Sequence, residues 1–224
     1  MSLSSSTLAL YGHPFSSYTQ KVLIALYENE TPFEFRCFGP DTPEHTREWL
    51  RRWPLRKFPL LLDGEREVVE SSIVIEYLEL AHPGKVRFVP SDPMAALEVR
   101  FLDRFFDLHI MNMMQHAVNG ALTGDPIKRR DGLAFAEEKL ELAYAWLEKH
   151  LEGKTWAAGD AFTLADCAAA PSLFYADWTY RISESYPLLR AYRARLLARP
   201  SFARAVDEAR PFRPNFPLGA PDRD

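Results

Sequence analysis

Hydroxyl side chains stand at two points of the sequence where a helix is expected to begin. At the first point, residues 12–14 interrupt an apolar run, and Ser16 and Ser17 follow directly before a helical pattern. The first turn of a helix carries unpaired backbone N–H groups and a partial positive charge, so it can hold an anion. A serine there is also an ordinary cap, because its hydroxyl accepts a hydrogen bond from one of those amides. Taken alone, this turn favours the cap.

The second point is Glu70, followed by Ser71 and Ser72. Capping is again the ordinary explanation. The functional alternative is a binding site, in which a ligand α-carboxylate would bind the amide and hydroxyl of Ser71. Glu70 would then hold the neighbouring ammonium group by a charge-assisted hydrogen bond. Such a pair of contacts would suit a ligand that carries an amino-acid end.

Pro59 lies at the beginning of an expected strand, where it cannot donate a hydrogen bond to a neighbouring strand. A cis peptide between Phe58 and Pro59 would turn the N–H and C=O of Phe58 outward. A backbone edge of this kind can pair with an extended peptide as a short added strand. Together with the two helix N-termini, this edge predicts a site for an anionic peptide.

The elements that must position these residues form an α/β unit in the first part of the chain. Its short apolar runs alternate with helical patterns, which is typical of that fold class. Strands are expected at 7–11, 33–38, 58–62 and 65–69, and helices at 18–30, 44–53 and 71–80. The Asp63-Gly64 pair predicts a hairpin turn between the last two strands. The expected order is β-α-β-α-β-β-α.

The remainder of the chain shows only helical patterns. A proline-rich linker at 83–93 ends in Asp92-Pro93, which is typical of a helix N-cap followed by a first-turn proline. Helices are expected at 94–118, 133–151, 163–178, 188–199 and 202–209, and the tail from 210 onward is expected to be extended over the surface. The domains are therefore predicted as 1–82, the linker, and an all-helical 94–224.

Composition excludes several classes of function. The net charge is −4 with both signs interspersed, which argues against nucleic acid or an anionic membrane as a partner. The basic residues within 47–57 fit a solvated helix face better than an anion site. Cys37 and Cys167 lack the spacing of a zinc site or a redox pair, which predicts a reduced cytoplasmic setting and no metal. Neither a signal peptide nor a membrane span is expected.

In their order and spacing, these segments resemble the glutathione S-transferase family. The likeness extends over the whole chain and rests on Leu10-Tyr11-Gly12-His13-Pro14-Phe15-Ser16, Val22-Leu23-Ile24-Ala25-Leu26, Lys57-Phe58-Pro59, Glu70-Ser71 and Phe162-Thr163-Leu164-Ala165-Asp166. It is similar to the serine-type classes (phi, theta and zeta) and to bacterial members. The resemblance implies a thioredoxin-like domain that binds glutathione, followed by an all-helical domain whose Thr163-x-x-Asp166 is a structural capping box.

The resemblance also implies roles for individual residues. It makes Ser16 the catalytic hydroxyl, with Ser17 as a less favoured substitute. The glutathione contacts would be Ser16, Ser17, Lys57, Phe58, a cis Pro59, Glu70 and Ser71. The candidates for binding the glycyl carboxylate are His45, Arg56 and Lys57, because Trp53-Pro54-Leu55-Arg56 departs from the usual Asn-Pro-x-Gly of the family.

The resemblance implies that the pocket for the second substrate lies between the first domain and the helix that contains Phe105, His109, Met113 and His116. These residues recur at helical spacing and share a face. A core or a subunit interface explains that face more simply than a wall of an electrophile pocket does. Flexible methionine would nevertheless suit varied apolar substrates.

The expected function is conjugation of the glutathione thiolate to small apolar electrophiles, as in detoxification, by a cytoplasmic homodimer. Glutathione is then a co-substrate, and no prosthetic group is needed. A glutathione-dependent isomerase, dehalogenase or lyase is the alternative within catalysis. A glutathione-binding scaffold protein without turnover is the alternative outside catalysis. The sequence does not rank the reactions, because the residues that would separate them come together only in the fold.

Overall fold

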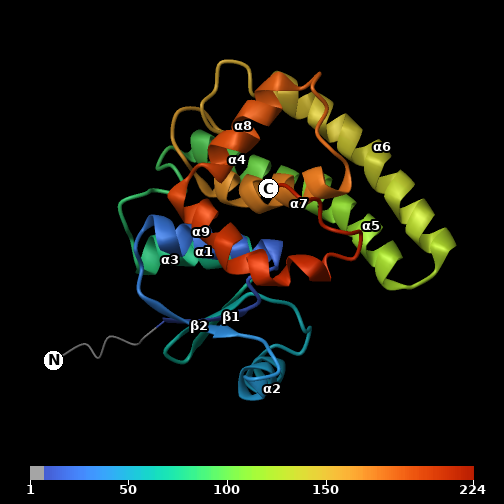
Figure 1. The fold of residues 1–224 in the computed structure, drawn as a ribbon. Coiled ribbons are helices and arrows are strands. Elements are labelled where there is room, and N and C mark those ends of the chain that lie inside the picture. The colour runs from blue at the N-terminus through green and yellow to red at the C-terminus, as the bar shows by residue number, and fades with distance from the viewer. Residues whose placement is uncertain (1–7) are drawn as a thin grey trace.

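A four-stranded sheet forms the centre of the N-terminal part of the computed structural model, which describes residues 8–224 (Figure 1). Its strand order is β2-β1-β3-β4, with β1 parallel to β2 and the other pairs antiparallel. The elements of this part are β1 Leu8–Gly12, α1 Ser17–Glu28, β2 Phe33–Cys37, α2 Pro43–Arg52, β3 Leu60–Asp63, β4 Arg66–Val69 and α3 Ser71–Ala81. The expected order of strands and helices is confirmed.

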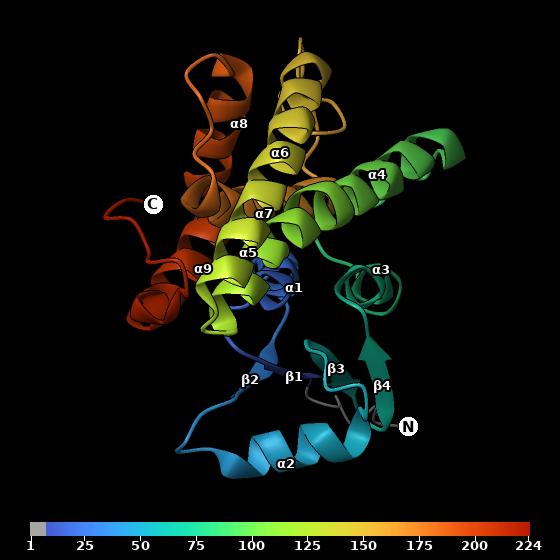
Figure 2. The same cartoon turned by 90° about the vertical axis from the view of Figure 1, so that its right-hand side faces the viewer.

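The alternation of side chains along β1 places helices on both faces of the sheet. Leu8 and Leu10 belong to the large apolar core that includes α1 and α3. Ala9 and Tyr11 point the other way, into a smaller cluster with Trp49 of α2. Successive strand residues face opposite sides, so one buried strand supplies both cores. Figure 2 shows α2 on one side of the sheet, with α1 and α3 on the other.

The C-terminal part is all-helical, as expected. Its α-helices are α4 Pro93–Phe105, α5 Asn112–Leu122, α6 Pro126–His150, α7 Leu164–Thr179, α8 Pro187–Leu197 and α9 Pro200–Ala209. Every residue of α7 but Thr179 is buried, and this helix runs through the middle of the domain (Figure 1). The Thr163 N–H donates to Asp166 Oδ2 at 2.8 Å, and this capping box fixes the start of α7.

The helix expected at 94–118 is interrupted. The π-helix η1, Phe106–Met111, separates α4 from α5. A π-turn widens the backbone spiral and shifts the side chains that follow, and such turns are frequent at functional sites. Here Asp107 lies within the π-turn and reaches Lys21 of α1 at 2.8 Å. Because this partner lies in the other domain, helical periodicity alone did not reveal the interruption.

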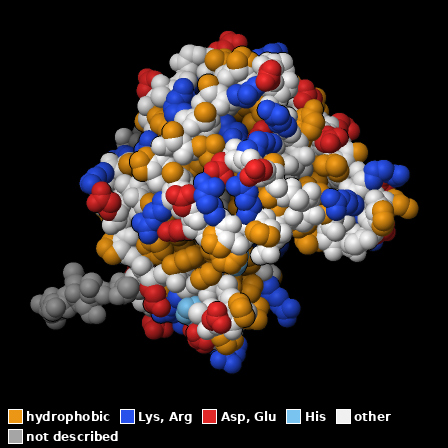
Figure 3. Space-filling view, viewed as in Figure 1, with side chains coloured by type: hydrophobic (Ala, Val, Ile, Leu, Met, Phe, Trp, Pro, Cys, Tyr) orange, Lys and Arg blue, Asp and Glu red, His pale blue; other side chains and the backbone are white. Residues whose placement is uncertain are grey.

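Two other boundaries differ from expectation. Helix α6 begins at Pro126 and not at 133, because the Asp125 side chain accepts from Ile127 N at 2.8 Å and caps the helix. The first turns of α6 are solvent-exposed and show no apolar stripe. The tail is not extended throughout, because Arg210–Asn215 form the short 3-10 helix η2. Within residues 8–224, no helix is both long and apolar enough to cross a membrane, and no cluster of metal-binding side chains is present. On the face drawn in Figure 3, basic and acidic side chains are interspersed.

Candidate functional site

A cavity of about 320 Å³ lies where the two parts of the chain meet. Its walls come from α1, from the loop before β3, from the start of α3 and from the α4–η1–α5 segment. The lining residues are Tyr18, Trp53, Lys57, Phe58, Pro59, Glu70, Ser71, Ser72, Arg104, Asp107, Leu108 and Asn112. The cavity therefore contains five of the residues that the sequence singled out for glutathione.

The loop before β3 presents three of these five residues, Lys57, Phe58 and Pro59. The Phe58–Pro59 peptide is cis, as expected. The ladder between β3 and β4 begins at the pair Leu60–Val69, so Phe58 lies beyond the paired part of the sheet. Trp49 of α2 holds the loop, because its Nε1 donates to the Lys57 carbonyl at 2.9 Å.

Glu70 and Ser71 enter the cavity at the start of α3. Glu70 has a φ of 67°, a left-handed backbone conformation that is uncommon for any residue other than glycine. Such a conformation costs about 1–3 kcal/mol and clusters at functional sites. The Glu70 carbonyl accepts from Val74 N at 2.8 Å, so the helix begins there and the Glu70 side chain remains available to the cavity.

Ser16 is the N-cap of α1. Its Oγ accepts from Thr19 N at 3.3 Å, and its backbone φ of −86° and ψ of 125° are those of an ordinary cap. The hydroxyl proton is not used by that bond. Ser17 is the first residue of α1. Neither serine belongs to the set that lines the cavity, whereas Tyr18 does.

The turn that carries Ser16 is held by the helical domain. The Tyr175 hydroxyl of α7 donates to the Phe15 carbonyl at 3.0 Å and accepts from Gln20 Nε2 at 3.1 Å. Gln20 Nε2 also donates to the Pro14 carbonyl at 2.9 Å. Gln20 and Tyr175 are both buried. The position of the Ser16 hydroxyl is therefore fixed from both domains.

Several lining residues were not found by the sequence analysis. Tyr18, Trp53 and Ser72 belong to the first domain. The others come from the face that the helical domain turns toward it, and they are Arg104, Asp107, Leu108 and Asn112. One sequence signal could have indicated part of this set. Asp103 and Asp107 fall on the same helical stripe as the buried Val99 and Phe106. Carboxylates on an apolar stripe are expected to have buried partners.

Those partners form a buried ionic network behind the cavity. Lys21 of α1 is 1% exposed, and its Nζ lies 2.6 Å from Asp103 and 2.8 Å from Asp107. The Lys21 ammonium also donates to Ser72 Oγ at 3.0 Å. Burial raises the pKa of the Asp107 carboxyl above its ordinary value, while Lys21 opposes that shift. The network links α1, α3 and the α4–η1 segment at the level of the cavity.

The residues expected on the wall of an electrophile pocket lie on the α4–η1–α5 segment, but on a different face from the one that lines the cavity. Phe105 is buried against Trp146, with ring centroids 4.4 Å apart. His109 is exposed and packs beside Phe105 at 5.2 Å, and Met113 packs against the main core. These three residues do not line the cavity between the domains, and Leu108 and Asn112 of the same segment do. His116 packs against Phe135 of α6, with ring centroids 4.7 Å apart.

The glycyl-carboxylate candidates divide in the same way. Lys57 lines the cavity. The His45 ring lies 3.0 Å from the Cys37 carbonyl through Nδ1, outside the lining set. Arg56 has a φ of 56° at the position where the Asn-Pro-x-Gly pattern would carry glycine. The backbone thus keeps the left-handed turn although the residue there is arginine.

The sheet with its cis-proline loop, the serine-capped first helix and the all-helical second domain together define a glutathione S-transferase fold. Comparison with known families agrees over most of the chain. Residues 10–86 match the N-terminal domain of glutathione S-transferases, and residues 110–200 match the C-terminal domain of the same family. The chain belongs to the glutathione S-transferase family.

Individual relatives cover nearly the whole chain. The probable maleylacetoacetate isomerase of Vibrio cholerae is 29% identical over 92% of this chain and 98% of its own length. Glutathione S-transferase F6 of Arabidopsis thaliana is also 29% identical, over 87% of this chain and 96% of its own length. A glutathione transferase homologue from Drosophila mojavensis, solved with bound glutathione, superposes with a TM-score of 0.78 at 23% identity, and covers 92% of this chain and 94% of its own.

Proposed function

We propose that this protein is a serine-type glutathione transferase that adds the glutathione thiolate to small apolar electrophiles. The observation that carries the proposal is the meeting of Lys57, the cis Phe58–Pro59 edge, Glu70 and Ser71 in one cavity. These groups match the cysteinyl backbone and the γ-glutamyl end of the tripeptide. Phe58 suits the cysteinyl backbone, Glu70 suits the α-ammonium, and the start of α3 at Ser71 suits the α-carboxylate.

The proposed chemistry is activation of a thiol that is bound and not part of the protein. A free cysteine thiol has a pKa of about 8.5. The Ser16 hydroxyl donates a hydrogen bond to the sulfur, and one such bond to a charged acceptor contributes about 1.5–3 kcal/mol. The N-terminus of α1 adds about 0.3–1 kcal/mol. Together they lower the thiol pKa by about one to three units, since one unit corresponds to about 1.4 kcal/mol.

In this mechanism Ser16 itself is not the nucleophile. Its Oγ already accepts from Thr19 N, which leaves the hydroxyl proton for the sulfur. The thiol proton passes to water, and the thiolate forms a bond to the electrophilic carbon. A halide leaves with the electron pair of its bond, or an enone takes up a proton after addition.

A second candidate is glutathione-dependent cis–trans isomerisation. It is favoured by the similarity to the probable maleylacetoacetate isomerase, which equals the similarity to the plant transferase. The same thiolate would add to a conjugated double bond, allow rotation and leave again. Assays with maleylacetoacetate beside a panel of halides, epoxides and enones separate the two, because only isomerisation returns glutathione unchanged.

Replacing Glu70 with glutamine is expected to weaken glutathione binding by about 10- to 100-fold. The variant loses the charge of a charge-assisted hydrogen bond to the ammonium group, and such a bond contributes about 1.5–3 kcal/mol. Glutamine, like glutamate, carries a β-carbon, so the cost of the left-handed backbone conformation at this position is similar in the variant and the wild type. Titration calorimetry with glutathione measures the change.

The control for this experiment is Glu65→Gln, which removes the same charge from the exposed end of the β3–β4 hairpin. A glutathione analogue without the amino group should bind the wild type and Glu70→Gln equally. If Glu70→Gln bound glutathione as tightly as the control does, Glu70 would not hold the ammonium group. If the wild type gave no binding heat at all, the proposed function would fail as a whole.

We propose further that the protein forms a homodimer through an apolar face shared by α3 and α4. The two helices lie side by side, because Arg100 of α4 pairs with Glu76 of α3 at 2.7 Å. The exposed apolar residues of this face are Ile73, Leu80, Met94, Leu97 and Phe101. Several exposed large apolar side chains on two adjacent helices are typical of a protein interface.

Light scattering is therefore expected to give about twice the chain mass of 25.7 kDa. Phe101→Glu places a charge on this face, where its desolvation opposes association, and should shift the mass toward that of one chain. Leu122→Glu, at the exposed end of α5, is the matched control. A wild-type mass near that of one chain would rule out the dimer.

A further inference from the structure

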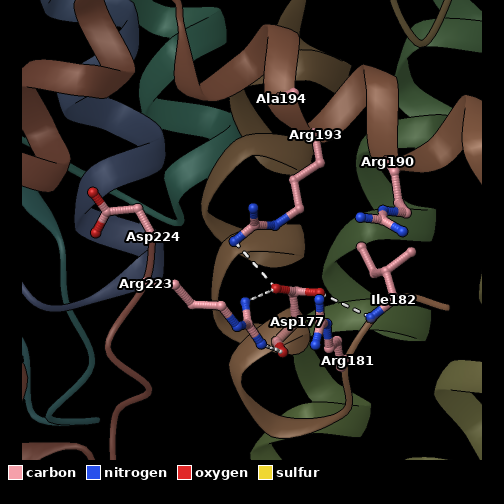
Figure 4. Close-up of a pocket in the computed structure, with 8 residues that line it drawn as sticks. All are labelled: Asp177, Arg181, Ile182, Arg190, Arg193, Ala194, Arg223 and Asp224. Carbon is pink, nitrogen blue, oxygen red and sulfur yellow. Dashed lines mark hydrogen bonds and ion pairs between the residues drawn. The ribbon is translucent and has the colours of Figure 1, made fainter. Parts of the chain in front are cut away.

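A second cavity, of about 230 Å³, lies within the helical domain (Figure 4). It is formed by the end of α7, the loop that follows, α8 and the last residues of the tail. None of its lining residues lines the cavity between the domains. Its charged residues are Asp177, Arg181, Arg190, Arg193, Arg223 and Asp224. The side chains around it thus carry two more positive than negative charges.

The two carboxylates of this cavity are already engaged. Asp177 Oδ1 accepts from Ile182 N at 2.8 Å, and Oδ2 accepts from the Arg223 guanidinium. Asp224 is bound by two arginines outside the cavity, Arg210 at 2.6 Å and Arg213 at 3.0 Å. Of the other arginines, Arg190 pairs with the exposed Glu184 at 3.3 Å, and Arg193 lies against Asp177, whose oxygens are already used.

Arg193 is the arginine of this wall whose N–H groups most clearly lack hydrogen-bond acceptors. Its side chain is 12% exposed, and both Nε and Nη2 are buried without a hydrogen-bond partner. Nη2 lies 3.4 Å from Asp177 Oδ2, which is an ion pair without hydrogen-bond geometry (Figure 4). Burial lowers the pKa of the Arg193 guanidinium, an effect that Asp177 opposes and Arg223 increases. Buried polar groups of this kind are normally satisfied, so the two N–H groups indicate a missing acceptor.

We propose that this cavity binds a phosphate group, either free or as a small monoester. Phosphate carries a charge of about −1.5 to −2 at neutral pH, which matches the excess positive charge of the wall. Its oxygens accept the paired N–H groups of a guanidinium in the geometry that arginine prefers. The bound group supplies acceptors for Arg193. It also adds a counter-charge for Arg181 and for Arg190, whose partner Glu184 is 86% exposed.

Titration of the full-length protein with inorganic phosphate, at an ionic strength held constant with chloride, tests this site. One phosphate per chain is expected. Arg193→Gln and Arg190→Gln should each weaken binding by at least about tenfold, because each loses a charge-assisted contact. Arg195→Gln is the matched control, since it removes a charge from the same helix at a residue that does not line the cavity.

Glycerol 3-phosphate and succinate are titrated in parallel. Tighter binding of the ester identifies a monoester as the ligand, and equal binding identifies free phosphate; both support the site. Tighter binding of succinate overturns it in favour of a dicarboxylate. Unchanged phosphate binding in Arg190→Gln, whose side chain is 42% exposed and tolerant of change, overturns it even if Arg193→Gln does not fold. Glu70→Gln should bind phosphate normally, so the result is independent of glutathione binding.

Discussion

Replacing Ser16 with alanine is expected to lower kcat/KM for conjugation by about 10- to 100-fold. The expected loss follows from the hydrogen bond of about 1.5–3 kcal/mol that the hydroxyl donates to the thiolate. Glutathione affinity should change less than turnover, because the groups that bind the two ends of the tripeptide remain. Steady-state kinetics with a halide substrate, at saturating and limiting glutathione, separates the two effects.

The pH dependence of the Ser16→Ala variant distinguishes activation of the thiol from a general loss of structure. Without the hydroxyl donor, the pKa of the bound thiol should rise toward its free value of about 8.5. The activity deficit should then be largest near neutral pH and should shrink as the pH passes that value, because the thiolate forms there without help. A deficit that is the same at every pH would contradict this role.

Two further variants separate the loss of the Ser16 hydroxyl as a donor to the sulfur from its loss as the cap of α1. Ser16→Ala removes the acceptor of the Thr19 N–H, which should cost about 1 kcal/mol of folding free energy. Ser16→Thr restores both the acceptor and the donor and should recover most of the activity. Ser17→Ala removes the neighbouring hydroxyl without removing the cap. If Ser17→Ala and not Ser16→Ala raised the thiol pKa, the catalytic assignment would move to Ser17.

Much of the N-terminal domain follows from local sequence. The expected strand at 33–38 and helix at 71–80 differ by one residue from Phe33–Cys37 and Ser71–Ala81. The strand expected at 7–11 runs from Leu8 to Gly12, with residue 7 outside the described part of the chain. These elements have strong local signals, namely apolar alternation, turn residues and capping serines. Local signals also identified Phe58, Pro59, Glu70 and Ser71 as candidate binding residues.

The helical half of the cavity could not be predicted in this way. The π-turn at Phe106–Met111 shifts the side chains after it, so a face drawn at ideal helical spacing through Phe105 and His109 departs from the one that meets the first domain. Leu108 and Asn112 reach the cavity instead. The shift accompanies a contact between Asp107 and Lys21, residues that are far apart in the chain. Periodicity within one helix carries no information about such a partner.

That contact also leads to the second large expected effect. Lys21→Met should destabilise the protein by about 3–5 kcal/mol, the usual cost of removing one partner from a buried ionic group. Methionine preserves most of the side-chain volume, so the loss reflects two facing carboxylates, Asp103 and Asp107, without their ammonium. Arg104 lies 2.6 Å from Asp103 but is half exposed, and compensates only in part. Urea denaturation measures the free energy of unfolding.

The same variant should show a characteristic pH dependence. Burial already raises the pKa of Asp107, and Lys21 opposes that rise, so its removal should raise the pKa further. A carboxyl whose folded pKa exceeds its unfolded value of about 3.9 favours the folded state below that value, and this contribution is lost as the pH rises through the folded pKa. The deficit of Lys21→Met should therefore be smaller at acidic than at neutral pH, and adding Asp107→Asn should recover part of it. Lys85→Met, which breaks an exposed pair with Glu30, should cost much less than Lys21→Met at any pH. Equal costs for the two lysine variants would show that the buried network does not hold the two domains around the cavity.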